Sequence, residues 1–479
     1  MCNGLNKKNN MKKILLLSTL LVASLSHAQT PCTNGFAGVY PCNNVDLMTH
    51  LDFPQIGGGN NTRGSGCWGW TDPLTNKEYA LMGCSTHTAF VDITNPSAPI
   101  YLGKLNAHNN SSSIWRELTV YNNHAYIASE ANGHGLQIFD LTRLRNVTTP
   151  QTFTVDARYD GFGNCHTVSI NQATGFLYCD GTGTFNGGPH VLDLQNPVSP
   201  TFSFGYAAEE YTHDAQIIVY DGPDPDHQGK ELFIGANETK VVIVDVTDKQ
   251  NPTTLSTFFY SNTGYTHQGW FTSDKRYWIL GDELDELNFG FNSKSIIIDM
   301  TDLDNPILKG EYSGPTEAID HNGFVRGNEF FLANYTAGLR ILNTSNITAT
   351  NTMTEVGFFD TYPEDNSANF NGAWNNYPFF PSGTIIISDI DRGLFIVRKN
   401  AILSSETFIA NDYKVYPNPA SSFFKINSEI EVDTVVLYDV LGKEIKSYKK
   451  SDSYDVSDLK KGLYFVKVNN DFTKKLMIK

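Results

Sequence analysis

The chain has 479 residues, with 51 acidic and 35 basic side chains and a formal net charge of −16. Nucleic acids and anionic membrane surfaces are bound through lysine and arginine, so this charge balance excludes both as principal partners. Aromatic residues make up 12% of the chain and there are 39 glycines, which favours an all-β fold with many turns.

Residues 1–28 have the pattern of a cleaved secretory signal. Lys12 and Lys13 form a positive region, Ile14 to Leu25 an apolar run, and Ser26-His27-Ala28 a small-residue cleavage site. The apolar run is too short to span a bilayer, and the sequence after it predicts no transmembrane segment. We therefore expect an exported protein whose mature chain starts at Gln29. No cysteine follows the cleavage site, which argues against a lipoprotein anchor.

One motif recurs along residues 65–398 with a period of about fifty residues, which is typical of a β-propeller. Each copy is a short apolar run that ends in a polar residue, as in Phe90-Val91-Asp92-Ile93-Thr94. The equivalent positions are Asp92, Asp140, Asp193, Asp245, Asp299, Asn343 and Arg398. Asp and Thr side chains bond local backbone groups where a strand ends, so we interpret these aspartates as turn formers and not as catalytic groups. Seven copies predict a seven-bladed propeller.

Each unit divides into four predicted strands. In the second unit they are residues 117–121, 125–129, 136–141 and 152–155. The seventh unit lacks a fourth strand, but Val45 to Phe53, in the N-terminal segment 29–64, has the pattern of one. We expect this segment to pair with the seventh unit and close the ring, which removes the two edges that an open array of sheets would expose.

Six cysteines remain after the signal region, and an even number in an exported chain predicts disulfides, although six allow fifteen pairings. Two pairs would each join neighbouring strands of one hairpin, and a third pair is left near the mature N-terminus. The pairs are Cys67 with Cys84, Cys165 with Cys179, and Cys32 with Cys42. A cysteine metal site is the alternative, but the sequence has no close Cys-x-x-Cys pair.

The repeat region also resembles a known family, the choice-of-anchor B domain, whose units are called LVIVD repeats. The resemblance runs from about Pro31 to Lys399 and is carried by several segments: Tyr40-Pro41-Cys42-Asn43-Asn44-Val45-Asp46-Leu47, Trp68-Gly69-Trp70-Thr71-Asp72-Pro73, Thr88-Ala89-Phe90-Val91-Asp92-Ile93-Thr94 and Ser113-Ile114-Trp115-Arg116-Glu117. It implies an exported domain whose members differ in how they are anchored, and it implies no activity.

Residues 399–412 are predicted to be a linker, and residues 413–479 a small C-terminal β-sandwich of short alternating strands. This tail resembles the type A sorting domain of the type IX secretion system of Bacteroidetes. The resemblance is carried by Val415-Tyr416-Pro417-Asn418-Pro419, Val436-Leu437-Tyr438-Asp439, Gly442-Lys443-Glu444 and Gly462-Leu463-Tyr464-Phe465. It implies recognition by the type IX machinery and removal of the tail by a sortase. The protein would then be released or attached to surface lipopolysaccharide, outside the cell or on the outer membrane.

Alignment of the first strands of the seven units brings polar residues into register. One column holds Cys67, Arg116, His166, His213, His267, His321 and Phe370, and the next holds Trp68, Glu117, Thr167, Asp214, Gln268, Asn322 and Asn371. A third column, at the ends of the second strands, contains Glu130, Asp180, Asp282 and Asp389. First strands line the axis of a propeller, so we expect a polar ring at one mouth of the channel. Its candidate ligand residues are Arg116, Glu117, His166, His213, Asp214, His267, Gln268, His321, Asn322 and Asn371.

Three interpretations of this ring stay open. It is a structural network, since buried polar groups must be hydrogen-bonded. It is a binding site for a glycan, a peptide or protein, or a cation, with Trp70, Trp115, Trp270 and Trp374 as platforms. Or it is the site of a metal-assisted hydrolase or lyase acting on extracellular carbohydrate, with His213, Asp214, His166 and His267 as the first candidates.

A divalent cation is the one cofactor that the sequence indicates. Glu130, Asp180, Asp282 and Asp389 are its candidate ligands, and the acidic run from Asp282 to Glu286 is a candidate calcium site. The sequence does not identify catalytic residues. We expect a binding or interaction module more than an enzyme.

Overall fold

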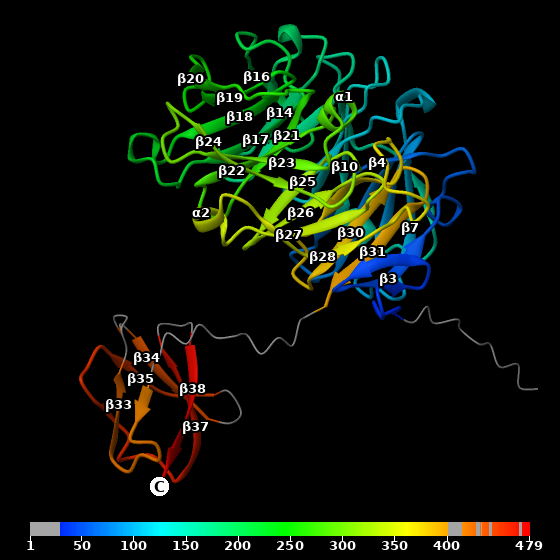
Figure 1. Ribbon diagram of the computed structural model, residues 1–479. Helices are drawn as coiled ribbons and strands as arrows, with labels where there is room; N and C mark the ends of the chain where they lie inside the picture. Colours follow the sequence, from blue (N-terminus) through cyan, green and yellow to red (C-terminus); the bar gives the residue numbers. More distant parts are fainter. Residues whose placement is uncertain (1–28, 401–413, 428–431, 433, 440–442, 469–471) are drawn as a thin grey trace, which may run out of the picture. The chain divides into compact units, whose positions relative to one another are not determined.

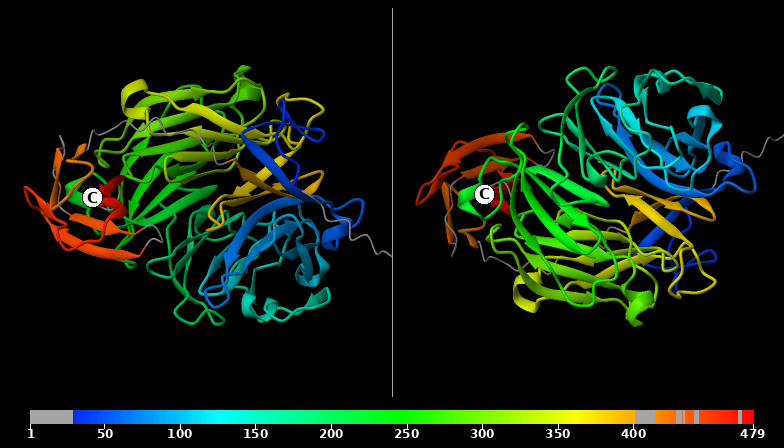
Figure 2. Two further views of the ribbon diagram at one scale, coloured as in Figure 1. Left: turned by 90° about the horizontal axis from the view of Figure 1, so that it is seen from below. Right: turned by 90° about the horizontal axis from the view of Figure 1, so that it is seen from above.

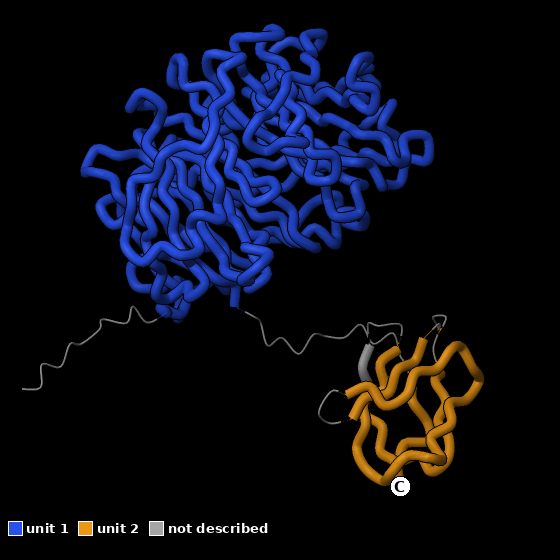
Figure 3. Tube along the Cα trace, turned by 180° about the vertical axis from the view of Figure 1, so that it is seen from behind, with its two compact units in different colours: residues 1–400 blue, residues 401–479 orange. Residues whose placement is uncertain are grey.

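A computed structural model describes residues 29–400, 414–427, 432, 434–439, 443–468 and 472–479. The predicted signal and most of the predicted linker lie outside these residues. The chain divides into two compact units, residues 1–400 and 401–479 (Figure 3). No helix among the described residues is long and apolar enough to cross a membrane.

The described part of the first unit contains seven antiparallel sheets of at least four strands (Figure 1). The first two sheets in chain order are β4 (Gly64–Thr71), β5 (Glu78–Cys84), β6 (His87–Asp92) and β7 (Ile100–Asn106), then β8 (Leu118–Tyr121), β9 (His124–Ile127), β10 (Leu136–Asp140) and β12 (Ala157–Tyr159). The next two are β13 (Thr167–Asn171), β14 (Phe176–Asp180), β15 (His190–Asp193) and β16 (Thr201–Gly205), then β17 (Asp214–Val219), β18 (Glu231–Asn237), β19 (Lys240–Asp245) and β20 (Thr253–Phe258).

The last three sheets complete the series. They are β21 (Thr266–Phe271), β22 (Tyr277–Asp282), β23 (Lys294–Asp299) and β24 (Ile307–Ser313), then β25 (Gly323–Arg326), β26 (Glu329–Ala333), β27 (Leu339–Asn343) and β28 (Thr354–Phe359), and finally β29 (Ala373–Tyr377), β30 (Thr384–Asp389), β31 (Gly393–Lys399) and β3 (Val45–Leu51). Two short helices, α1 (Asp285–Phe289) and α2 (Ile347–Thr350), lie in loops between strands.

The sheets follow one another around an axis. The first strand of each sheet contacts the first strand of the next, and β29 of the last sheet contacts β4 of the first. Figure 2 shows this succession from blue through green to orange, with the orange strands returning to the blue ones. The apolar cores lie between neighbouring sheets: one cluster joins Met48 of β3, Ala80 of β5 and Ile386 of β30. This is the architecture of a β-propeller.

The N-terminal segment connects the last two sheets of the series. β3 pairs antiparallel with β31, as the sequence pattern of Val45 to Phe53 indicates (Figure 1). The preceding hairpin, β1 (Phe36–Ala37) and β2 (Tyr40–Asn43), extends the sheet of β25–β28, where Cys42 pairs with Phe359. A disulfide joins Cys32 to Cys42 within this segment.

The recurring aspartates act as turn formers. The Asp92 carboxylate accepts a hydrogen bond from the backbone N–H of Thr94 at 3.0 Å, and the Asp245 carboxylate accepts one from Thr247 at 3.0 Å. The same bond recurs at Asp140, Asp193, Asp299 and Asn343. Each bond ends the third strand of its sheet and starts the turn that leads to the fourth.

The predicted fourth strand of the second unit is wrong. Residues 151–153 form β11 (Gln151–Phe153), which pairs parallel with β7 of the preceding sheet, and β12 takes the fourth position instead. The ring of Phe153 packs between the two sheets, 5.7 Å from Phe90 of the preceding sheet and 5.1 Å from Phe139 of its own unit, both between centroids. Local pattern identifies a strand here but does not determine which edge it joins.

The two predicted hairpin disulfides are also wrong. Cys67, Cys84, Cys165 and Cys179 are free, buried thiols. A bulge between Gly64 and Cys67 shifts the register, so that Cys67 lies opposite Met82 and not opposite Cys84. Cys165 lies before β13, and its thiol donates to the carbonyl oxygen of Thr167 at 2.9 Å.

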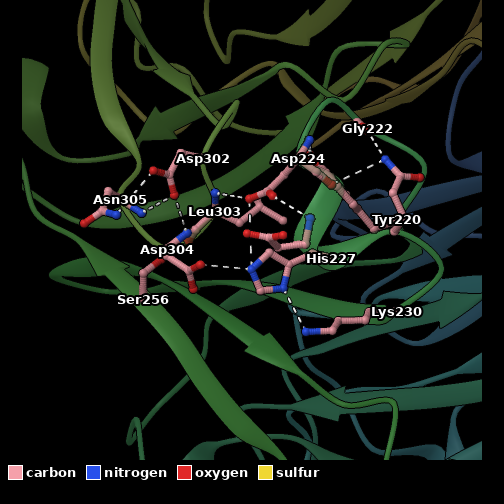
Figure 4. Close-up of polar contacts among 12 residues, drawn as sticks. Tyr220, Gly222, Asp224, His227, Lys230, Ser256, Asp302, Leu303, Asp304 and Asn305 are labelled. Atoms are coloured by element: carbon pink, nitrogen blue, oxygen red, sulfur yellow. Dashed lines mark hydrogen bonds and ion pairs between the residues drawn. The ribbon is translucent and has the colours of Figure 1, made fainter.

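Polar loops also tie neighbouring sheets together, as Figure 4 shows for the loop before β18. The Asp224 carboxylate accepts from the backbone N–H of Leu303 at 2.8 Å. The two ring nitrogens of buried His227 contact Asp304 Oδ2 at 3.2 Å and Lys230 Nζ at 3.0 Å. Since both nitrogens of His227 have a partner, this histidine is structural.

The second unit has two small sheets around one apolar core. One consists of β32 (Lys414–Tyr416), β33 (Phe423–Asn427) and β36 (Tyr454–Asp455), and the other of β35 (Glu444–Lys449), β34 (Thr434–Tyr438), β37 (Gly462–Val468) and β38 (Phe472–Ile478). Phe424, Leu437 and Val466 meet in the core between them. Gly442, in one of the segments that resemble the sorting domain, lies outside the described residues.

Candidate functional site

The first strands of the propeller line a large cavity of about 650 Å³. One wall of this cavity is aromatic, and its rings contact one another in series. Trp68 lies 5.1 Å from Tyr377 and 5.8 Å from Phe324, and Trp270 lies 5.0 Å from Phe324, all between ring centroids. Phe379 adjoins both Tyr377 and Phe324. The cavity therefore offers a broad apolar surface.

Polar groups line the same cavity beside the aromatic wall. They include Glu117, Asp214, Asn322 and Asn375. The side-chain oxygen of Asn322 is buried and has no hydrogen-bond partner among the described residues. Lys275 also lines the cavity, and its ammonium group pairs with Asp221 at 3.1 Å, which neutralises much of its charge. The lining thus presents acids and amides with little free positive charge.

A smaller cavity of about 40 Å³ adjoins the large one. Both are lined by Glu117, Thr167, Asp214 and Asn322, so these residues mark the junction. The small cavity is further lined by a set of histidines and by residues next to them: His166, His213, His267, His321, Trp115, Trp374 and Glu283. The histidine rings follow one another at 4.2, 4.2 and 4.3 Å between centroids.

Backbone carbonyls fix the tautomers of two of these histidines. His213 Nδ1 lies 3.0 Å from the carbonyl oxygen of His267, and His321 Nδ1 lies 2.5 Å from the carbonyl oxygen of Trp374. A carbonyl oxygen accepts and does not donate, so in both residues Nδ1 carries the proton and donates it. Nε2 of each ring is left with a free lone pair.

The other two histidines differ. His166 Nδ1 lies 2.6 Å from Glu130 Oε1, so a carboxylate takes the place of the carbonyl. His267 is 2% exposed, and its Nδ1 has no hydrogen-bond partner in the described part of the chain. Burial lowers the pKa of His213 and of His267 well below the usual histidine value and that of His321 to about 3. These imidazoles are therefore neutral.

Burial has the opposite effect on the carboxyl groups of the junction and the small cavity. It raises the pKa of Glu117 to about 7, although the Trp374 indole N–H donates to Glu117 Oε1 at 2.9 Å. Burial also raises the pKa of Glu283 to about 7. The pKa of Asp214 is raised well above its usual value by burial and then by the charge of Glu117. Gly66 leaves room for Glu117, since a Cβ there would lie 2.1 Å from Glu117 Oε2.

The structure brings seven of the ten candidate ligand residues to the small cavity: Glu117, His166, His213, Asp214, His267, His321 and Asn322. Arg116 lies elsewhere: it is fully buried and bonds the carbonyl oxygen of Cys84 at 2.9 Å. Gln268 lines the large cavity, but its amide bonds both backbone groups of Gly323.

The predicted alignment of the first strand of the seventh unit is wrong. Phe370 is 43% exposed, and Asn371 bonds Asp391 away from both cavities. Trp374 and Asn375 occupy the expected positions instead. The Trp374 carbonyl accepts a hydrogen bond from His321, just as the His267 carbonyl accepts one from His213. The long loop before β29 contains the four extra residues that mislead the alignment.

The predicted acidic cation ligands are dispersed. Glu130 is hydrogen-bonded to His166, and the Asp282 carboxylate accepts hydrogen bonds from the backbone N–H groups of Gly264 and Tyr265. Asp389 accepts from Asp391 and Arg392 N–H groups, both at 2.8 Å. Asp180 is buried, with neither carboxyl oxygen partnered among the described residues, and burial raises its pKa well above the usual value.

Burial, and then the charges of Glu286, Asp285 and Asp282, raise the pKa of Asp320 well above its usual value. Three acids of the run from Asp282 to Glu286 therefore lie near one another, and none of the three lines the small cavity. Asp285 pairs with Lys294 at 2.8 Å, and Glu286 accepts from the backbone N–H of Lys294. Glu283 alone lines the small cavity, and the alignment of columns missed it because it stands one residue after the Asp282 position. Glu238 likewise follows the last residue of β18, Asn237, so a column one residue further on would have included Glu283.

Comparison with known proteins identifies the C-terminal tail of the chain. Residues 414–479 match the family model described as a secretion system C-terminal sorting domain. This tail marks the chain for the type IX secretion system and directs it to the extracellular space or the outer-membrane surface. No curated protein matches the chain.

Solved structures resemble the propeller at low identity. Kuenenia stuttgartiensis hydrazine synthase is 10% identical, with a TM-score of 0.50, over 73% of this chain and 97% of that one. The C-terminal WD40 domain of Sif2 is 9% identical, with a TM-score of 0.47, over 74% and 98%. A Lactobacillus plantarum protein is 12% identical, with a TM-score of 0.44, over 82% and 98%. At these identities the likeness concerns the fold alone. The chain is thus an exported β-propeller protein with a sorting tail.

Proposed function

We propose that the chain is a seven-bladed propeller of the choice-of-anchor B type that binds a neutral carbohydrate in its central channel. The large cavity carries the proposal, because it combines an aromatic wall with acids and amides at the junction. The cyclic contacts from β4 to β29 and the pairing of β3 with β31 support seven blades in a closed ring.

The cavity chemistry favours a sugar over the other ligand classes. The C–H face of a sugar ring packs on Trp68 and Trp270, while its hydroxyls exchange hydrogen bonds with Asp214 and Asn322. Anionic ligands are disfavoured, since Lys275 is the one cation among the described residues that line this cavity and already pairs with Asp221. A volume of about 650 Å³ suits a ligand of one to a few sugar rings.

A glycan array with the full mature chain tests this proposal, followed by calorimetry on the saccharides retained. Trp270→Ala and Asp214→Asn should each weaken binding at least about tenfold, the equivalent of about 1.4 kcal/mol. Phe202→Ala is the matched control, because this aromatic residue lines neither cavity and is 50% exposed. Absence of any saccharide ligand, or equal binding by all variants, would contradict the proposal.

Catalysis is a second candidate, favoured by the Glu117 and Asp214 pair between the two cavities. Both carboxyls have a raised pKa, as expected for acids that donate or take up protons near neutral pH. The reaction class would be hydrolysis or elimination at an extracellular carbohydrate. Breakdown of an array-selected saccharide, lost in Glu117→Gln, would support an enzyme over a binding module.

We also propose that a sortase removes the tail after residues 414–479 are recognised by the secretion machinery. The propeller is then released or attached to surface lipopolysaccharide.

A further inference from the structure

We propose that the small cavity is a transition-metal centre, formed by Nε2 of His267, Nε2 of His321 and the carboxylate of Glu283. It lies in the channel of the proposed function but does not depend on the identity of the sugar. One ligand atom from each of these three residues lies within 4.8 Å of the other two.

The distances suit a metal ion better than direct hydrogen bonds. His321 Nε2 lies 3.5 Å from Glu283 Oε1, and His267 Nε2 lies 3.8 Å from Glu283 Oε2. Both exceed the usual range for an N–H···O hydrogen bond, so the three residues do not satisfy one another. Ligand atoms around a tetrahedral Zn²⁺ at 2.0–2.1 Å stand about 3.3 Å apart, so small side-chain shifts would bring this set into coordination.

The orientation of His321 is that of a metal ligand. Its Nδ1–H donates to the Trp374 carbonyl, which turns the Nε2 lone pair toward Glu283. Metal-ligating histidines characteristically donate their second ring N–H to a carbonyl or a carboxylate. His213 repeats the arrangement with the His267 carbonyl and stands next to the set, with its ring 4.2 Å from that of His267.

His267 and Glu283 have surroundings that an ion would complete. Nε2 of buried His267 makes no hydrogen bond among the described residues and lies 3.8 Å from Glu283 Oε2, in contrast to His227, whose two nitrogens both have partners. Glu283 Oε1 accepts from the Tyr335 hydroxyl at 2.7 Å, which holds the carboxylate in place. A scaffold role alone would have given Nε2 of His267 a hydrogen-bond partner, as both ring nitrogens of His227 have.

Two imidazoles and one carboxylate favour Zn²⁺ or another first-row divalent ion over Ca²⁺, which takes oxygen ligands. Three protein ligands leave a position open toward the junction with the large cavity, where Glu117 and Asp214 lie. Four-coordinate zinc sites with three protein ligands hold water or a substrate atom at that position. The centre would thus face the sugar-binding cavity.

The test uses the full mature chain, stripped with a chelator and titrated with ZnCl₂ alone by calorimetry, with metal content counted by elemental analysis. We expect one Zn²⁺ per chain and a loss of affinity of at least about 100-fold in Glu283→Gln, His267→Ala and His321→Ala. Glu286→Gln, three residues from Glu283 but bonded to Lys294, is the matched control and should bind as the native chain does. Co²⁺ in place of Zn²⁺ should give visible absorption bands that Glu283→Gln removes.

Absence of saturable Zn²⁺ or Co²⁺ binding would overturn the metal centre, as would stoichiometric binding that persists in Glu283→Gln. Glu283→Gln keeps the size of the side chain, so it remains informative where a histidine variant does not fold. The saccharide screen is independent: sugar binding without metal leaves the proposed function in place, and metal binding without sugar leaves the centre in place.

Discussion

The Cys32–Cys42 disulfide should stabilise the propeller measurably, because it closes the segment that joins the last two sheets. Its cysteines are 10 residues apart, and the loss of chain entropy on closing a loop of this size corresponds to about 3 kcal/mol of unfolding free energy. The double variant Cys32→Ala/Cys42→Ala should lose this amount in guanidinium unfolding experiments.

The reductant provides the control for this prediction. Reduction of the native chain should reproduce the loss seen in the double variant, and it should leave the variant itself unchanged. A difference below about 0.5 kcal/mol, within the range of ordinary surface substitutions, would refute the reasoning. It would show that β1 and β2 are not part of the cooperative unit that the ring forms.

Three further predictions concern the free cysteines, Asp389 and Asp72. Unfolded mature chain should show four reactive thiols before reduction and two more after it in a colorimetric titration, whereas six before reduction would mean no disulfide. Burial raises the pKa of Asp389 from 3.8 to about 7. Because the unfolded state loses this proton first, the free energy of unfolding should fall by up to about 1.4 kcal/mol per pH unit as the pH rises between these values. Asp389→Asn should flatten that fall in pH-dependent unfolding experiments. Arg145 donates to both Asp72 oxygens, at 2.7 and 2.8 Å, and lowers the pKa of Asp72 to about 2. This pair should therefore stabilise the folded state above pH 3.8 and lose that effect as the pH falls to about 2. An acid-unfolding curve of the native chain identical to that of Asp72→Asn would contradict this.

Much of the fold could be predicted because it repeats. The Asp92 type of turn occurs at nearly every unit with the same hydrogen bond, so a local pattern sampled many times identifies the third strands. The pattern of Val45 to Phe53 likewise indicates an outer strand, and the empty edge of the seventh unit gives it one place to pair.

The departures arise where geometry depends on contacts distant in sequence. Residues 151–153 have a strand pattern, but they pair with β7, about fifty residues earlier in the chain, which the local pattern does not encode. The bulge before Cys67 shifts the register by an amount that hydrophobic alternation does not encode, and the pairing with Cys84 fails.

The sequence predicts the four repeated histidines of the candidate site but not Glu283. Four histidines share one column because each begins a first strand at the same register. Glu283 stands one residue beyond the predicted third column, in the loop after β22, and the folded chain brings its carboxylate within 3.5 Å of His321. Sites that combine a repeated element with one exceptional residue are found from sequence only in part.

The central claim is that the channel of this exported propeller binds a carbohydrate. The most direct measurement is a crystal structure of the mature chain with a saccharide selected by the array. We predict sugar density in the 650 Å³ cavity, packed on Trp68 and Trp270 and within hydrogen-bond distance of Asp214. Density confined to the outer strands, with the channel free of sugar, would contradict the account.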